Sequence, residues 1–466
     1  MSSAARKPRT KKIAIQTNSA FAHLAAAEAA LARVLPMTQP ADAVLHGFFR
    51  AHADLGQRDR QFIAETVFGI LRRRIALEYH TGADTPRRLL LAYLNRVQGM
   101  SLRQLEPLLG NDNAQWAAGL KARPDAAAPL HVKAELPEWL AAMLAADMPE
   151  NDILALGRAM QQPAPLDLRV NALTGARDKI MQQLAIEGLK VQPTPYAPLG
   201  IRVDGNPALG RNPLFTSGRI EIQDEGSQLL CYLLAPKRRE MVADFCAGAG
   251  GKTLALGALM QSQGRLYAFD ISDSRLNKLK PRLKRSGLSN VHPQLLASEN
   301  DIKVKRLAGK LDRVLVDAPC SGFGTLRRNP DLKWRQNAAG IAELTAKQGR
   351  ILTAAAALVK PGGRLVYATC SFVRAENQGV IAAFLATHPQ FLLLPANQVL
   401  AQQHIALDTG EYLQLYPHRH GCDGFFAAVL ERTPPAPGVR GRPPLRSSHD
   451  ILRRAMLKFI PSITVI

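Results

Sequence analysis

The chain has 466 residues, more than one hydrophobic core ordinarily supports, so two or three domains are expected. Its apolar fraction of 47% is typical of a globular protein and excludes a fibrous or disordered chain. The formal net charge of +22 favours a polyanionic partner, with nucleic acid considered first and an anionic membrane surface second.

Cysteine usage points to a reducing compartment. The cysteines are widely spaced and odd in number, with no C-x-x-C pair, which excludes a disulfide framework and a zinc motif. No apolar run reaches the length of a membrane span. We therefore expect a cytoplasmic, monomeric protein with neither a metal site nor a membrane partner. The five cysteines are Cys231, Cys246, Cys320, Cys370 and Cys422.

The first half of the chain divides into three segments. Residues 1–15 are basic and expected to be a disordered arm, whereas residues 16–150 follow a helical pattern rich in alanine and leucine. Within it, LGQRDRQFIAETVFGILRRR (55–74) combines an apolar helix face with arginines at its ends. Residues 160–235 mix short strand patterns with a helical stretch, which indicates a small α/β subdomain.

Residues 236–432 alternate apolar strand patterns with helical ones. Strands nearly continuous in Val, Leu and Ile are typical of a parallel sheet covered on both faces, so a doubly wound, Rossmann-like domain is predicted. The strand patterns are MVADF, RLYAFD (265–270), DRVLVDAP (312–319) and GRLVYATC (363–370), and a Pro/Arg-rich tail over 433–466 follows the domain.

A glycine-rich turn follows the first of these strands, in DFCAGAGGKT (244–253). Ligands of doubly wound sheets bind at the carboxyl ends of the strands, and Asp270 ends the next strand, where a carboxylate can accept both hydroxyls of a ribose. Cys246 stands where a phosphate loop needs glycine, and Thr253 where a G-x-G-x-x-G site needs its third. S-adenosylmethionine needs no phosphate cradle, and Lys252 could pair with its carboxylate. The alternative that the loop is only a tight turn stays open at this point.

Two further strand ends each carry a cysteine, in DAPCSG around Cys320 and in ATCS around Cys370. Such a cysteine is most often an inert small apolar residue. A thiolate that adds to carbon 6 of cytosine makes carbon 5 nucleophilic enough to take a methyl group from a sulfonium, which is covalent catalysis. Two cysteines on one rim beside a nucleoside pocket fit that chemistry.

Several separated motifs resemble those of the Sun-type (Fmu, Nop-like) RNA cytosine-5 methyltransferases, over about residues 160–432. They are DFCAGAGGKT, VDAPCSGFGTLRRNPDLKW (316–334), LVYATCSF (365–372), RVNAL (169–173), QDEGSQL (223–229) and HGCDGFFAAVL (420–430). The resemblance implies S-adenosylmethionine as cofactor, Cys370 as the nucleophile and Cys320 as the group that assists release. DNA cytosine methyltransferases use a Pro-Cys nucleophile, so the reversed assignment is the mechanistic alternative. The implied cofactor pocket comprises Cys246, Ala247, Gly248, Ala249, Gly250, Gly251, Lys252, Asp270 and Asp317, with Arg275 placed beside it on the basic helix 275–285.

The helical region resembles the NusB-like RNA-binding domain of the RsmB branch, mainly through residues 55–74. It implies small-subunit (16S-type) ribosomal RNA as substrate, and the α/β subdomain is expected to be RRM-like. A transfer RNA cytosine-5 methyltransferase and a non-catalytic RNA-binding assembly factor are the alternatives. The second predicts loss of catalytic residues, yet Cys320, Cys370, Lys252 and Asp270 are all present.

Two details stay open. The family usually has an aspartate near the adenine after the third strand, where this chain has Leu296 or Ala297, with Glu299 or Asp301 as possible substitutes. The segment after Cys320 is basic and aromatic. It is expected either to grip RNA phosphates and stack a base or to be a loop packed by a structural tryptophan. Its residues are Arg327, Arg328, Lys333 and Trp334.

Overall fold

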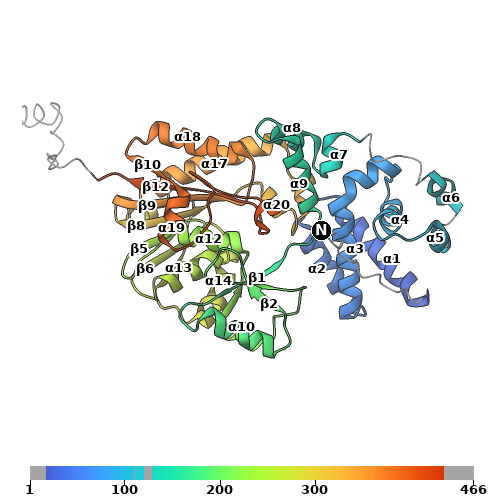
Figure 1. Cartoon of the computed structure of the whole chain (residues 1–466), viewed down its shortest axis with the longest axis horizontal. Coiled ribbons are helices and arrows are strands. Elements are labelled where there is room, and N and C mark those ends of the chain that lie inside the picture. Colours follow the sequence, from blue (N-terminus) through green and yellow to red (C-terminus); the bar gives the residue numbers. More distant parts are fainter. Residues whose placement is uncertain (1–16, 110, 120–127, 435–466) are drawn as a thin grey trace, which may run out of the picture.

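The computed structural model describes residues 17–109, 111–119 and 128–434. The expected basic arm and nearly all of the expected tail therefore lie outside the described residues. A helical region forms one end of the molecule and a larger α/β region the other (Figure 1).

The helical region is organised around α3, whose 25 residues include fully buried Ile63, Val67 and Ile70. Gly69 lets α4 approach closely, because a Cβ atom there would lie 2.2 Å from the hydroxyl oxygen of Tyr93. The helical prediction for this region is confirmed. Its elements are α1 (Thr17–Val34), α2 (Ala41–Ala51), α3 (Gln57–Thr81), α4 (Pro86–Arg96), α5 (Leu102–Leu109), α6 (Asn111–Ala118), α7 (Leu130–Ala134), α8 (Glu138–Ala145) and α9 (Glu150–Met160).

A small antiparallel sheet follows, with strand order β2-β3-β1-β4. All five residues of β1 are buried. One face of β1 packs against Ile180 and Leu184 of α10. The carbonyl of Leu168 accepts a hydrogen bond from the side chain of Gln228 in α12 (Glu225–Leu234). The subdomain consists of β1 (Leu166–Val170), α10 (Arg177–Ile186), β2 (Val191–Pro193), β3 (Gly200–Val203), α11 (Pro213–Thr216) and β4 (Ile220–Ile222).

The large sheet has the order β10-β12-β9-β8-β5-β6-β7, with β11 paired to β12. The strands from β7 to β9 are parallel, as predicted, but β12 pairs antiparallel with β9, β10 and β11. The sheet is therefore parallel over the strands that the sequence indicated and becomes mixed at its edge, where β12 pairs antiparallel with β9. The strands are β5 (Met241–Asp244), β6 (Arg265–Asp270), β7 (Val291–Leu295), β8 (Leu311–Asp317), β9 (Val359–Thr369), β10 (Phe391–Leu394), β11 (Leu413–Leu415) and β12 (Phe425–Arg432).

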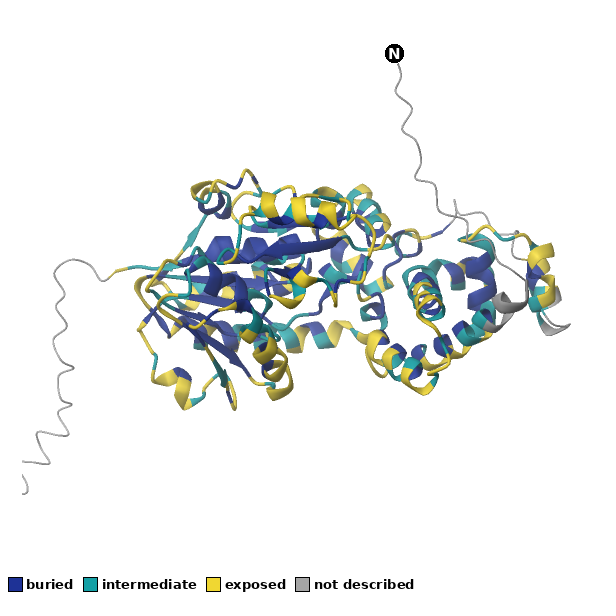
Figure 2. Cartoon of the chain, turned by 90° about the horizontal axis from the view of Figure 1, so that it is seen from below, coloured by how far each residue is buried: buried dark blue, intermediate teal, exposed yellow. Residues whose placement is uncertain are grey.

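Both faces of this sheet are covered, which confirms the doubly wound prediction. Alternate residues of a strand enter different cores: Leu315 of β8 packs in one cluster, whereas Val314 and Val316 pack in the other. The strands are accordingly the most buried part of the molecule (Figure 2). The helical elements are α12 (Glu225–Leu234), α13 (Gly251–Leu259), α14 (Asp273–Ser286), α15 (Ile302–Lys305), η3 (Phe323–Thr325), α16 (Leu332–Arg335), α17 (Ala338–Ala356), η4 (Arg374–Glu376), α18 (Gln378–Thr387), α19 (Ala396–Gln402) and α20 (Pro417–His420).

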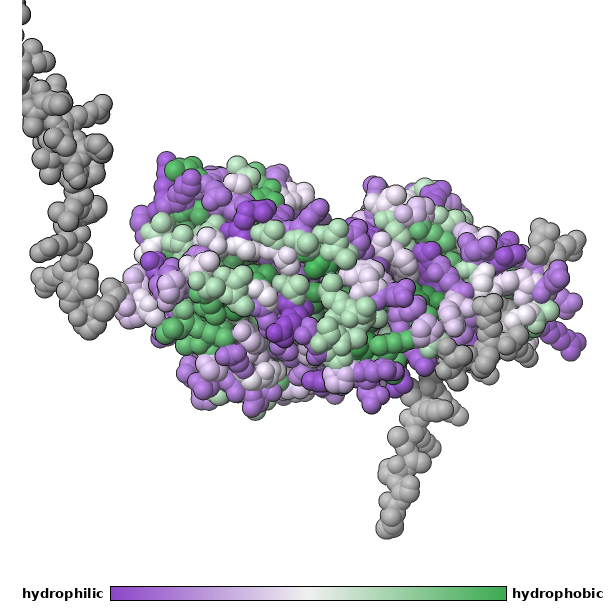
Figure 3. Space-filling model, turned by 90° about the horizontal axis from the view of Figure 1, so that it is seen from above, coloured by the Kyte–Doolittle hydropathy of each residue, from purple (hydrophilic) through white to green (hydrophobic). Residues whose placement is uncertain are grey.

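On the face seen in Figure 3, hydrophilic and hydrophobic areas alternate over both regions. Within the described ranges, no helix combines the length and apolar character needed to cross a bilayer.

Candidate active site

The carboxyl ends of β5, β6, β8 and β9 bring the predicted site residues to one rim of the sheet. Parallel pairing places Asp244 beside Leu315 and Asp317 beside Ala368, so the loops that follow these strands are neighbours. The glycine turn therefore shares this rim with Asp270 and Asp317 and with the two cysteines that follow β8 and β9. These groups are far apart in the sequence.

The glycine turn has the geometry of a tight strand-to-helix connection. Gly248 and Gly250 have φ angles of 56° and 87°, which glycine adopts without strain. A Cβ atom on Gly248 would meet nothing within 4 Å, so the backbone is open on that side. Gly250 is the N-cap of α13, whose first amide groups face the rim. The loop can thus admit a ligand close to its backbone.

Asp270 connects β6 to this turn. Its carboxylate accepts hydrogen bonds from the amide of Gly248 at 2.8 Å and from the amide of Ser272 at 2.8 Å. A carboxylate has about four acceptor sites, so sites for ribose hydroxyls remain.

Lys252 has a protein partner, which the sequence did not indicate. Its ammonium group donates to Asp317 at 2.6 Å. Burial alone would lower the pKa of Lys252, but attraction to Asp317 outweighs it and the pKa is raised. Lys252 is therefore a cation paired with Asp317, and its ammonium group has further N–H donors for a cofactor carboxylate.

Cys246 lies in the same turn, but its thiol has low nucleophilicity. Burial, and then the charges of Asp317 and Asp244, raise the pKa of its thiol. A neutral, half-buried thiol can line a pocket but is a poor nucleophile.

The basic helix α14 contributes a residue other than the expected one. Arg275 is exposed in the first turn of α14. Arg282, farther along, donates to the carbonyl of Ala249 at 2.7 Å and pairs with buried Glu221 at 2.9 Å. Arg285 pairs with the same carboxylate at 2.6 Å. Part of the helix thus braces the glycine turn, which its charge pattern alone did not reveal.

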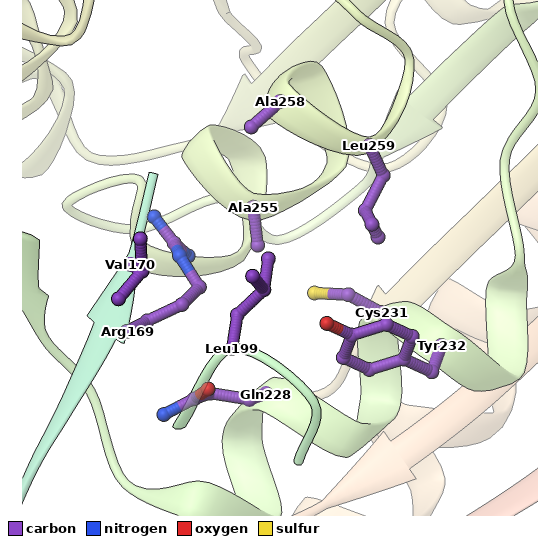
Figure 4. A pocket seen from close by; sticks show the side chains of 9 residues that line it. All are labelled: Arg169, Val170, Leu199, Gln228, Cys231, Tyr232, Ala255, Ala258 and Leu259. Carbon is purple, nitrogen blue, oxygen red and sulfur yellow. The ribbon is translucent and has the colours of Figure 1, made fainter. Parts of the chain in front are cut away.

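A second brace comes from the small sheet. Arg169 of β1 donates to the carbonyl of Gly251 at 2.8 Å and also to Gln223. Its Nε atom has no hydrogen-bond partner among the described residues, and neither has Oε1 of Gln228. Both side chains line a small cavity between β1, α12 and α13, which the thiol of Cys231 also lines (Figure 4). Buried polar atoms of this kind usually bind an ordered water.

The two acids that follow β7, Glu299 and Asp301, both contact other groups of the protein. Asp301 caps α15 and accepts hydrogen bonds from the amides of Ala297 and Lys303, whereas Glu299 contacts Arg350 at 3.3 Å. Each carboxylate keeps further acceptor sites, so these contacts do not decide which residue replaces the family's adenine-contacting aspartate.

Cys320 and Cys370 lie at the centre of the rim, with their Sγ atoms 3.3 Å apart. Both side chains are half-buried. The hydrogen bond to Cys370, and then burial, raise the pKa of Cys320 well above its usual value. The two thiols are within hydrogen-bond distance of each other, and either sulfur can be the donor.

Of the two alternatives for the basic segment after Cys320, the contacts within the chain favour the packed, structural loop. Arg327 is buried and pairs with Asp423 at 3.1 Å, and Arg328 pairs with the same carboxylate at 2.6 Å. Lys333 is buried beside Glu135, and Trp334 packs against the helical core. Charge and aromatic content could not distinguish this arrangement, because the acidic partners are distant in the sequence.

No group of three or more His, Cys, Asp or Glu side chains in the described part of the chain could hold a metal ion. The mixed sheet, the glycine turn and the acid that ends β6 define a Rossmann-like methyltransferase.

Comparison with known proteins identifies the family. Residues 231–431 match the family described as 16S rRNA methyltransferase RsmB/F, and residues 136–209 match an RsmF/B-like ferredoxin-like domain. The ribosomal RNA small subunit methyltransferase B of Sodalis glossinidius is 32% identical over 86% of this chain and 95% of its own length. A Synechocystis relative, described as a probable ribosomal RNA small subunit methyltransferase B, is 37% identical over 64% of this chain and 66% of its own. The solved structure of PH0851 is similar with a TM-score of 0.74 at 25% identity, over 91% of this chain and 100% of that one. The chain belongs to the RsmB/F family and is an RNA methyltransferase.

Proposed function

We propose that the chain transfers a methyl group from S-adenosylmethionine to carbon 5 of a cytosine in small-subunit ribosomal RNA, through a covalent bond to Cys370. The observation that carries this proposal is the 3.3 Å separation of the Cys320 and Cys370 Sγ atoms beside the glycine turn. The class of RNA that we propose as substrate is taken from the names of the relatives.

The rim suits the cofactor chemically. S-adenosylmethionine supplies an electrophilic methyl group on a sulfonium. The open backbone at Gly248 and the acceptor sites of Asp270 would hold its nucleoside, with Asp317 oriented by Lys252 on the opposite side. The remaining turn residues from Cys246 to Gly251 would line this pocket, with Arg275, exposed in the first turn of α14, as the proposed contact from that helix.

Cys370 is the proposed nucleophile because it stands in the Thr-Cys-Ser motif that resembles the family's nucleophile. The 3.3 Å separation allows the S–H of Cys320 to donate to Cys370, and such a hydrogen bond would hold a thiolate there. The thiolate forms an S–C6 bond with cytosine, and the displaced electron pair makes carbon 5 the nucleophile. Carbon 5 then takes the methyl group.

Release requires loss of the carbon 5 proton and cleavage of the S–C6 bond. A base at the rim accepts the proton, and the electron pair left on carbon 5 re-forms the C5–C6 double bond and expels Cys370 as thiolate. Cys320 lies close enough to Cys370 to be that base, provided that its own proton has first been lost to solvent.

The test is methyl transfer from labelled S-adenosylmethionine to protein-free ribosomal RNA, intact small subunits and transfer RNA. Wild type is compared with Cys370→Ala, Cys320→Ala and the control Cys422→Ala, which removes a buried thiol just before β12. We expect labelled 5-methylcytosine in small-subunit RNA, no product with Cys370→Ala, and a trapped protein–RNA adduct with Cys320→Ala.

The other outcomes are equally informative. Turnover by Cys370→Ala but not by Cys320→Ala reverses the roles of the cysteines. Labelling of transfer RNA alone changes the substrate class. Absence of transfer to every RNA would instead indicate a binding factor.

A further inference from the structure

A buried carboxylate lies beneath the two rim cysteines. Glu376 ends the short helix η4, on the same loop as Cys370, and its side chain is fully buried. Neither cysteine motif includes it. We propose that Glu376 is a positioning residue that sets the separation of the two Sγ atoms, an inference that rests on the proposed function of the cysteines.

The carboxylate holds the residue that follows each cysteine. Ser321, next to Cys320, donates its amide to Glu376 Oε1 at 2.8 Å and its hydroxyl to Oε2 at 2.5 Å. Ser371, next to Cys370, donates its hydroxyl to the same Oε2 at 2.6 Å. One side chain therefore joins two loops whose serines are 50 residues apart in the sequence.

Other bonds hold Glu376 itself in place. Gln348 of α17 donates to Oε1 of Glu376 at 3.0 Å and to the carbonyl of Pro319 at 3.0 Å. The hydroxyl of Tyr367 donates to the backbone carbonyl of Glu376 at 2.7 Å. The carboxylate thus sits in a fixed frame contributed by β9, α17 and the loop after β8.

A carboxylate accepts on both oxygens without any change in its neighbours. The amide of glutamine would direct its N–H donors toward the two serine hydroxyls, which now donate and would have to turn and accept. Glu376→Gln keeps the size of the side chain but removes the oxygen that accepts hydrogen bonds from the hydroxyls of Ser321 and Ser371. A displacement of about 1 Å in a reacting group costs roughly 100-fold in rate.

The first test requires no RNA. Phenylarsine oxide reacts with two adjacent thiols, forming two As–S bonds and releasing one water, so no oxidant is needed. We expect one equivalent to bridge Cys320 and Cys370 in wild type, measured by intact mass and by protection of both thiols from alkylation. Glu376→Gln should lose most of this bridging. Glu343→Gln, the same change at an exposed site of α17, should retain it.

The second test measures steady-state kinetics with RNA for kcat and KM, and single turnovers for formation and release of the protein–RNA adduct. Glu376→Gln should lower kcat about 100-fold while the KM for RNA stays unchanged. Ser371→Ala should slow adduct formation, and Ser321→Ala should slow adduct release. A general loss of stability would not separate the two steps in this way, so these variants decide the question if Glu376→Gln does not fold.

Bridging and kcat at wild-type levels in Glu376→Gln would overturn the proposal. Equal slowing of both steps by either serine variant would do the same. If wild type methylates no RNA, the proposed function fails, and the arsenical experiment still decides whether Glu376 positions the thiols.

Discussion

Glu135 and Lys333 lie 3.6 Å apart, each with a 3% exposed side chain, where the helical region meets the loop that follows Cys320. Glu135 also accepts hydrogen bonds from the amides of Ile75 and Ala76, and Lys333 donates to the carbonyl of Arg72. Burial raises the pKa of Glu135 and lowers that of Lys333, so each charge depends on the other. The helical region therefore anchors the loop beside the active site.

Removing one member of this pair should be costly. Lys333→Met leaves a buried carboxylate without its cation, and we expect the free energy of unfolding to fall by about 3 kcal/mol. Adding Glu135→Gln to Lys333→Met should cost less than the sum of the single changes, because no lone charge remains. Denaturant unfolding followed by tryptophan fluorescence measures both. Lys310→Met, at an exposed position, is the control, and equal stability of Lys310→Met and Lys333→Met would refute the anchor.

Lys252 and Asp317 should act as one unit in cofactor binding. We expect Lys252→Met and Asp317→Asn each to weaken S-adenosylhomocysteine binding, because the 2.6 Å pair orients the carboxylate. The double variant should bind little worse than either single variant, with a coupling of about 1–2 kcal/mol by calorimetry. Strictly additive losses would mean that the two side chains act separately.

The two glycines of the turn provide a matched pair. Gly250→Ala places a Cβ atom 2.1 Å from Leu279 at a φ of 87°, so strain and overpacking should together cost about 3 kcal/mol of stability. Gly248→Ala meets open space, so only backbone strain of about 1 kcal/mol is expected. Thermal unfolding and S-adenosylhomocysteine titration separate the two effects. Gly248→Ala should mainly weaken binding, and a larger stability loss there than at Gly250 would contradict the observed packing.

Asp244 makes stability depend on pH with a defined sign. Burial raises its pKa from 3.8 to about 7, although the hydrogen bond from Thr253 opposes this. Between these values the folded chain holds a proton that the unfolded chain has lost, so this group favours folding most at low pH. Its contribution then declines as pH rises toward 7. Relative to Asp244→Asn, wild type should lose up to about 4 kcal/mol over that range.

Unfolding of wild type and Asp244→Asn from pH 4.5 to 8.5 measures this difference. Asp301 provides a control of opposite sign, because hydrogen bonds from the amides of Ala297 and Lys303 lower its pKa. Its carboxylate favours folding above its unfolded pKa, and that contribution declines as pH falls. Parallel pH profiles for wild type and Asp244→Asn would show that Asp244 is ionised without penalty.

Local patterns were sufficient for much of the molecule. Strands such as β6 and β8 are short apolar runs, and the turn at Gly248 and Gly250 needs positive φ angles that glycine readily adopts. These features depend on neighbouring residues, so the sequence predicted the doubly wound domain and the rim that carries both cysteines.

The same local patterns could not predict contacts between residues that are distant in the sequence. Arg327, Arg328 and Lys333 look like a phosphate grip in the sequence, yet Asp423 and Glu135 neutralise them from other parts of the chain. Glu376 is an ordinary acid in the sequence until two serines from separate loops donate to it.

The groups available at the ends of the strands could be read from the sequence, because backbone geometry and apolar periodicity act over a few residues. The contacts that these groups make depend on the folded chain. Lys252 is paired with Asp317, and the sulfur atoms of Cys320 and Cys370 are 3.3 Å apart. A buried charge or thiol takes its properties from the groups within a few ångströms, and those neighbours come from anywhere in the chain.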